Sequence, residues 1–92
     1  MSSQYNSGQN QQNIQSKTSL LIFLKGSVAP IVLYLENPKA VYEDIKELLK
    51  NTEAPKMIEL EAIGPLKKVS LSTAEISGLA LQEEKYVVGN QG

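Results

Sequence analysis

The stretch from Leu20 to Glu36, LLIFLKGSVAPIVLYLE, contains two apolar runs separated by a short interruption around Lys25 and Gly26. Both runs are rich in β-branched and aromatic residues, and a turn-forming glycine lies between them, which predicts a hairpin of two strands. Pro30 has no backbone N–H, so it belongs at the start of the second strand or on a sheet edge. Neither run alternates with polar residues, so each predicted strand has apolar side chains on both faces.

A helix is predicted directly after this hairpin. Asn37 is a favourable N-cap, and Pro38 fits the first helical position, where its missing N–H costs nothing. Pro55 indicates that the helix has ended before it. Apolar residues recur at helical spacing along one stripe, at Val41, Ile45, Leu48 and Leu49.

The segment after the helix predicts a second hairpin that turns at Gly64-Pro65. Pairing outward from this turn sets Leu60 opposite Val69 and Glu61 opposite Lys68. Apolar residues then share one face and opposite charges meet on the other, so both features agree on one register.

A short helical turn and a last strand are predicted next. Ser72 and Glu75 have the spacing of a capping box, which indicates a single helical turn with Ile76 in the core. Gly78 permits a bend into a short strand from Leu79 to Gln82.

These elements predict a small two-layer α+β domain, with an antiparallel sheet of order β-β-α-β-β-(short β) and one main helix. A chain of 92 residues is expected to form one domain. Residues 1–17 are rich in Gln, Asn and Ser and have little apolar surface to bury, which predicts a disordered tail. The domain is then expected over residues 18–88, with a frayed C-terminus at 89–92.

A single helix cannot cover both faces of the first predicted hairpin. We expect one set of side chains in the core, namely Leu20, Ile22, Leu33 and Leu35. The opposite set is then a candidate interface, namely Leu21, Phe23, Val32 and Tyr34. The two sets are interchangeable at this stage, because the sequence does not say which face the helix covers. The second face either closes against the second hairpin or meets another protein, and a two-fold homodimer is the commonest such assembly.

The composition argues against catalysis. The chain has no histidine and no cysteine, which removes the commonest general base, the thiolate nucleophile and the usual zinc ligands. No enzyme activity and no cofactor are therefore expected. Glu59 and Glu61 lie two apart on a predicted strand, about 7 Å between Cα atoms, and are candidate cation ligands. The competing interpretation is an exposed strand face paired with Lys67 and Lys68.

The charge balance gives no sign of a nucleic-acid partner, because nine basic and ten acidic residues leave a net charge of −1. Residues 20–35 are too short to cross a membrane and are interrupted by Lys25, so no membrane partner is expected. The absence of cysteine favours a cytoplasmic location. The sequence thus predicts a non-catalytic protein-interaction or self-association module that uses an apolar sheet face. The alternative is an ion- or ligand-binding regulatory domain that uses the strand carboxylates.

Overall fold

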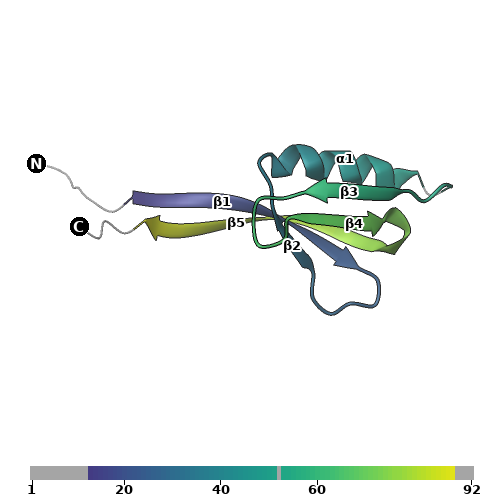
Figure 1. The fold of residues 1–92 in the computed structure, drawn as a ribbon, viewed down its shortest axis with the longest axis horizontal. Coiled ribbons are helices and arrows are strands. Elements are labelled where there is room, and N and C mark those ends of the chain that lie inside the picture. The colour runs from purple at the N-terminus through teal and green to yellow at the C-terminus, as the bar shows by residue number, and fades with distance from the viewer. Residues whose placement is uncertain (1–12, 52, 89–92) are drawn as a thin grey trace, which may run out of the picture.

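The computed structural model describes residues 13–51 and 53–88. Its strands form two antiparallel sheets, a three-stranded sheet of order β2-β1-β5 and a hairpin of β3 and β4 (Figure 1). The predicted α+β class and order of elements are confirmed. The elements are β1 (Asn13–Leu24), β2 (Ile31–Tyr34), α1 (Pro38–Lys50), β3 (Met57–Glu61), β4 (Lys68–Ser72), the 3-10 turn η1 (Thr73–Glu75) and β5 (Ile76–Val88).

The first hairpin forms as predicted, with Leu20 facing Leu33 across the β1–β2 pair. Its loop is longer than a tight turn because Pro30, which has no N–H to donate, lies just outside β2. Gly26 in this loop has a φ of 79°, a backbone conformation that residues other than glycine rarely adopt.

The helix begins and ends where the sequence predicts. The side chain of Asn37 accepts a hydrogen bond from the backbone N–H of Ala40 at 3.4 Å, and Pro38 is the first helical residue. Lys50 lies in the last turn, where a cation suits the helix dipole. Ile45 is the most deeply buried residue of the stripe, with 2% of its surface exposed.

The register predicted for the second hairpin is confirmed, because Leu60 faces Val69 and Glu61 faces Lys68. The helical turn after it is η1, in which the Ser72 side chain accepts a hydrogen bond from the N–H of Ala74 at 3.2 Å. Ile76 follows and is buried, as predicted.

The core lies on one face of the three-stranded sheet, which we call the inner face and which carries Leu20, Ile22 and Leu33. Both α1 and the β3–β4 hairpin pack against it, α1 through Ile45 and the hairpin through half-buried apolar side chains. The strands of the second hairpin therefore lie on the inner face, and its turn at Gly64 reaches the opposite, outer face at Tyr34. The hairpin residues packed on the core are Ile58, Leu60, Val69 and Leu71.

Two expected boundaries are wrong. The last strand is β5, which has 13 residues rather than the four from Leu79 to Gln82. β1 begins at Asn13, so residues 13–17 are paired strand and not a disordered tail. The tail is predicted from its lack of apolar side chains to bury. Residues 13–17 are ordered instead by backbone hydrogen bonding to β5, which does not require side-chain burial. The rest of the predicted tail, 1–12, and the predicted frayed end, 89–92, lie outside the described residues.

The pairing of β1 with β5 extends beyond the end of β2. The last residue of β1 that pairs with β2 is Ser19, whereas its pairing with β5 continues to Asn13. We call the two-stranded part the arm, residues 13–18 with 83–88, and the remainder the body. The arm projects from one end of the molecule (Figure 1). The molecule as a whole has principal extents of 62, 24 and 23 Å.

Candidate association surface

The predicted division of the first hairpin into two faces is present in the structure. Leu20, Ile22 and Leu33 are fully buried on the inner face. On the outer face Phe23 is 38% exposed, while Leu21, Val32 and Tyr34 are each half-buried. The four candidate interface residues therefore lie together on one sheet face, and none of them belongs to the core cluster.

The Phe23 end of the outer face is apolar and open. Phe23 faces Gly78 on β5, and its neighbour on the same face, Leu21, faces Ala80. Because glycine and alanine have little or no side chain, the Phe23 ring stands above the adjacent strand. A Cβ atom built on Gly78 would lie 3.7 Å from Phe23 Cδ1, in ordinary contact. This end is a shallow platform of large side chains beside small ones.

The Tyr34 end of the outer face is polar and partly closed. The Tyr34 hydroxyl donates a hydrogen bond to a Glu84 carboxylate oxygen at 3.3 Å, and the Lys17 ammonium lies 4.4 Å from the ring centre. Ser19 is completely buried among these groups. The turn of the second hairpin also reaches Tyr34, because a Cβ on Gly64 would lie 2.6 Å from Tyr34 Cδ2. Tyr34 is thus already engaged within its own chain.

Sequence reasoning missed Lys17 and Glu84 as neighbours of the candidate surface. They face each other across β1 and β5 and lie at the base of the arm. Lys17 lies in the predicted tail, and Glu84 lies beyond the end of the predicted last strand at Gln82.

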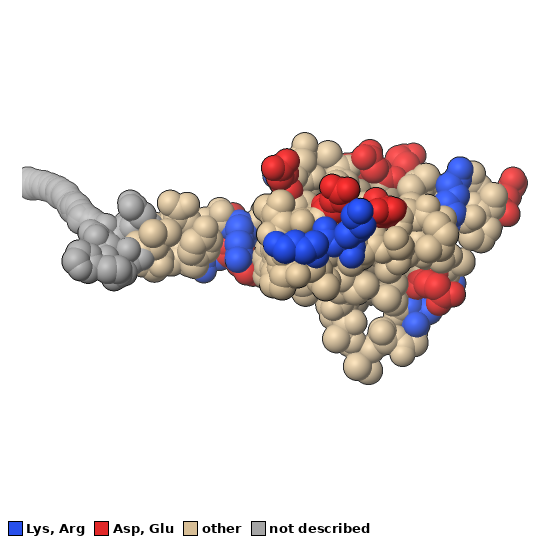
Figure 2. Space-filling model, in the orientation of Figure 1, with Lys and Arg blue, Asp and Glu red and all other residues tan. Residues whose placement is uncertain are grey.

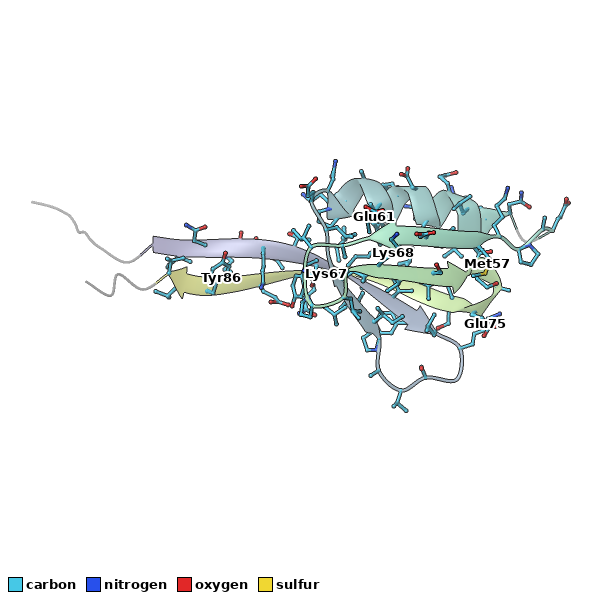
Figure 3. The ribbon with its side chains drawn as sticks, in the orientation of Figure 1. Met57, Glu61, Lys67, Lys68, Glu75 and Tyr86 are labelled. Carbon is cyan, nitrogen blue, oxygen red and sulfur yellow. The ribbon has the colours of Figure 1, made fainter. Side chains whose placement is uncertain are left out.

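Glu59 and Glu61 lie on the exposed face of β3, as predicted. The ammonium of Lys68 lies between them, 3.2 Å from a Glu59 oxygen and 3.9 Å from a Glu61 oxygen. Figure 3 shows Glu61, Lys67 and Lys68 along the β3–β4 hairpin, and Figure 2 shows lysine and acidic side chains intermixed over it. This arrangement is that of a salt-bridged strand face. In residues 13–51 and 53–88, no group of three or more side chains is arranged to hold a metal ion.

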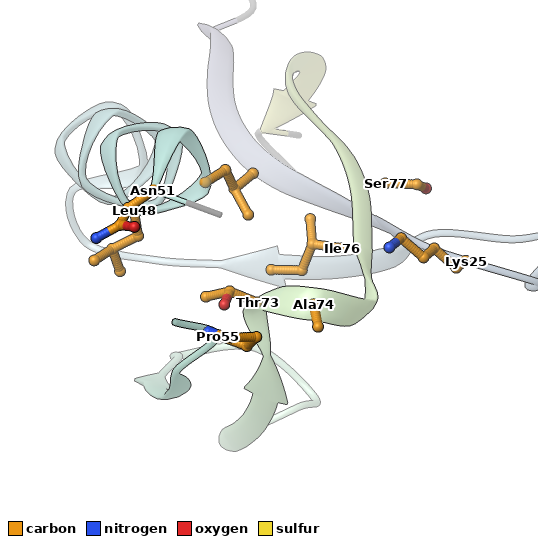
Figure 4. A pocket seen from close by; sticks show the side chains of 9 residues that line it. Lys25, Leu48, Asn51, Pro55, Thr73, Ala74, Ile76 and Ser77 are labelled. Atoms are coloured by element: carbon orange, nitrogen blue, oxygen red, sulfur yellow. The ribbon is translucent and has the colours of Figure 1, made fainter. Parts of the chain in front are cut away.

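A hollow of about 400 Å³ lies between the C-terminal end of α1 and η1 (Figure 4). Of the described residues that line it, Lys25 alone is ionisable, and the others are apolar or neutral polar residues such as Leu48, Asn51 and Ile76. A single cation without an acid or a base beside it provides no pair of groups for proton transfer. The hollow therefore gives no support to a catalytic function.

Two further observations bear on partners. Within the part of the chain that the structure describes, no helix is both long and apolar enough to span a membrane. No protein-family model matches the chain, and neither the curated proteins nor the solved structures contain a significant match to it.

Proposed function

We propose that this protein is a small non-catalytic module that associates with protein through the outer face of β1 and β2, with a second copy of the chain as its partner. The observation that carries this proposal is the open apolar platform around Phe23. The apolar side chains of α1, β3 and β4 that pack on the core lie on the inner face, so they do not cover the Phe23 end of the outer face.

The platform is suited to apolar contact. Large side chains at Leu21, Phe23 and Val32 are contiguous, because Leu21 and Val32 face each other across the β1–β2 pair. Monomeric proteins rarely expose contiguous apolar patches larger than a few hundred Å², and the largest patch on a protein is often functional. The near-balance of charge means that two copies do not strongly repel each other. A two-fold contact would bring the same platform from both copies together.

The first prediction is that Phe23→Glu abolishes association and leaves the fold intact. The new carboxylate stays hydrated on a free monomer, whereas it would be buried without a partner group in the complex. The molar mass should be measured by light scattering over a wide range of concentration, and folding by circular dichroism.

Two matched variants make the result interpretable. Val28→Glu adds the same charge in the loop, where Val28 is fully exposed, and should leave association unchanged. Ile22→Glu places the charge on the buried inner face and should unfold the domain. A complex whose molar mass survives Phe23→Glu, or is lost equally with Val28→Glu, would contradict the proposed surface.

A further inference from the structure

Within residues 13–51 and 53–88, the strand β5 has one edge that pairs with no other strand. It is the edge strand of the sheet β2-β1-β5, so only its β1 side is paired. Among the described residues, no backbone hydrogen bond outside the sheets involves residues 77–88. An edge with free N–H and C=O groups is a template for another strand.

The arm is the part of this edge that gains most from a further strand. It has only two strands, and a two-stranded ribbon is marginally stable by itself in water. Its apolar side chains are also exposed on both faces, with Ile14 at 68% and Val87 at 53% on one face and Tyr86 at 44% on the other. In Figure 2 the arm is mostly uncharged, with a narrow band of charge at its base.

Symmetry limits how two copies of β5 can pair. Antiparallel pairing about a two-fold axis normal to the sheet keeps each face continuous, so one residue lies on the axis and faces itself. Residues equally distant from the axis then face each other. With Glu84 on the axis, Glu83 of each copy faces Lys85 of the other, which forms two pairs of opposite charge. Leu81 likewise faces Val87.

We propose that two copies pair edge to edge through antiparallel β5 strands with Glu84 on the two-fold axis, which forms one six-stranded sheet. In this register residues 84–88 in the arm of each copy lie beside residues 80–84 of the other. Each arm thereby gains further strands, and the two bodies are staggered apart rather than pressed together.

The self-facing Glu84 is the least favourable position of this register. Its charge is partly offset within each copy, because it faces Lys17 across the β1–β5 pair. Its oxygen also accepts hydrogen bonds from the Tyr34 hydroxyl at 3.3 Å and from the Gln82 amide at 3.2 Å. The opposing interpretation is that three consecutive charges at 83–85 protect the edge against pairing. The experiments below separate the two.

A charge-reversal series is the first test, with the dimer dissociation constant measured by sedimentation equilibrium. Lys85→Glu or Glu83→Lys alone turns both favourable pairs into like-charge pairs and should weaken the dimer roughly tenfold or more. The double variant Glu83→Lys/Lys85→Glu restores both pairs and should recover the affinity. Single variants without effect, or a double variant as weak as the single ones, would overturn the proposal.

Single cysteines test the register directly, because the chain has no cysteine of its own. Two copies of Glu84→Cys would have Cα atoms about 4.5–5.5 Å apart, within reach of a disulfide. Gln82→Cys is the matched control on the same face, since its counterpart would lie four residues along, about 13 Å away. Mild oxidation should cross-link the first variant and spare the second. Equal cross-linking, or none at position 84, would refute this register.

This inference does not depend on the outer-face contact, and the same measurements distinguish the two. Both series should be repeated with Phe23→Glu. If the outer face is not an interface, Phe23→Glu leaves the molar mass unchanged while the charge-reversal variants still weaken the dimer. If the β5 edge is not an interface, the charge-reversal variants leave the dissociation constant unchanged while Phe23→Glu still lowers the molar mass. Either contact alone produces a dimer, and both contacts together produce assemblies larger than a dimer.

Discussion

The same two strands, β1 and β5, behave differently in the body and in the arm. In the body, Leu20 and Ile22 are completely buried beneath α1 and the second hairpin. In the arm, Ile14 lies on the same face of the same strand and is 68% exposed. Backbone pairing continues without a register shift from Asn13 to Phe23, so pairing alone does not produce a core.

The difference shows that strand formation and side-chain burial are separate properties of this fold. The body contributes the hydrophobic free energy, because the helix and the hairpin exclude water from its inner face. The arm extends the same ladder into solvent and depends on the body to keep the two strands in register. The predictions below test this division, beginning with the largest expected effect.

Leu20→Ala should destabilise the domain much more than Leu21→Ala. These neighbours are identical in type but lie on opposite faces, with Leu20 fully buried and Leu21 half-buried. The buried site should lose about 2–5 kcal/mol of unfolding free energy through lost burial and cavity formation. Urea denaturation measures both values. Equal losses would show that the outer face is as enclosed as the inner one.

Gly64→Ala should disturb the packing of the second hairpin's turn on Tyr34, which contacts Lys17 and Glu84 at the base of the arm. Its new Cβ would lie 2.6 Å from Tyr34 Cδ2, so the turn or the Tyr34 ring must move, at a cost of about 1–3 kcal/mol. Gly78→Ala is the matched control, since its Cβ would meet Phe23 only at ordinary contact distance. Thermal unfolding should show a clear decrease in Tm for the first variant. A Gly64→Ala protein as stable as Gly78→Ala would contradict this packing.

Ile14→Ala should change the stability of the monomer by less than about 0.5 kcal/mol, because surface side chains contribute little. Ile22→Ala, on the same face of the same strand, is the reference and should cost several times more. Denaturation at low protein concentration, where copies do not associate, allows the comparison. A large loss at Ile14 would mean that the arm takes part in the core.

Much of the fold could be predicted because local signals and hydrophobic pattern agreed. Asn37 and Pro38 mark the helix start by hydrogen-bond chemistry that needs no tertiary context. The turn at Gly64-Pro65 determined the second hairpin's register, since a shift of one residue would expose Leu60 and Val69. The extent of β5 could not be found in this way. Its outer half has no buried face, and its partner, residues 13–18, is more than 60 positions away along the chain.

The candidate surface was predictable as two alternatives but not as one. Two apolar sets on each strand follow from side-chain alternation, which is a covalent property of an extended chain. The polar end of the surface was not predictable, because Lys17 and Glu84 come together only through the long β1–β5 pairing.

The sequence by itself determined the kinds of element, their order, the helix cap, the second hairpin's register and the excess of apolar surface on the first hairpin. These features depend on backbone chemistry and on periodicities within about a dozen residues. Only the tertiary structure decided that Leu20, Ile22 and Leu33 are core, and that Leu21, Phe23 and Val32 remain partly exposed. The two sets are nearly equal in hydrophobicity, so the choice depends on which face α1 and the second hairpin occupy together. That is a property of the whole chain rather than of any single segment.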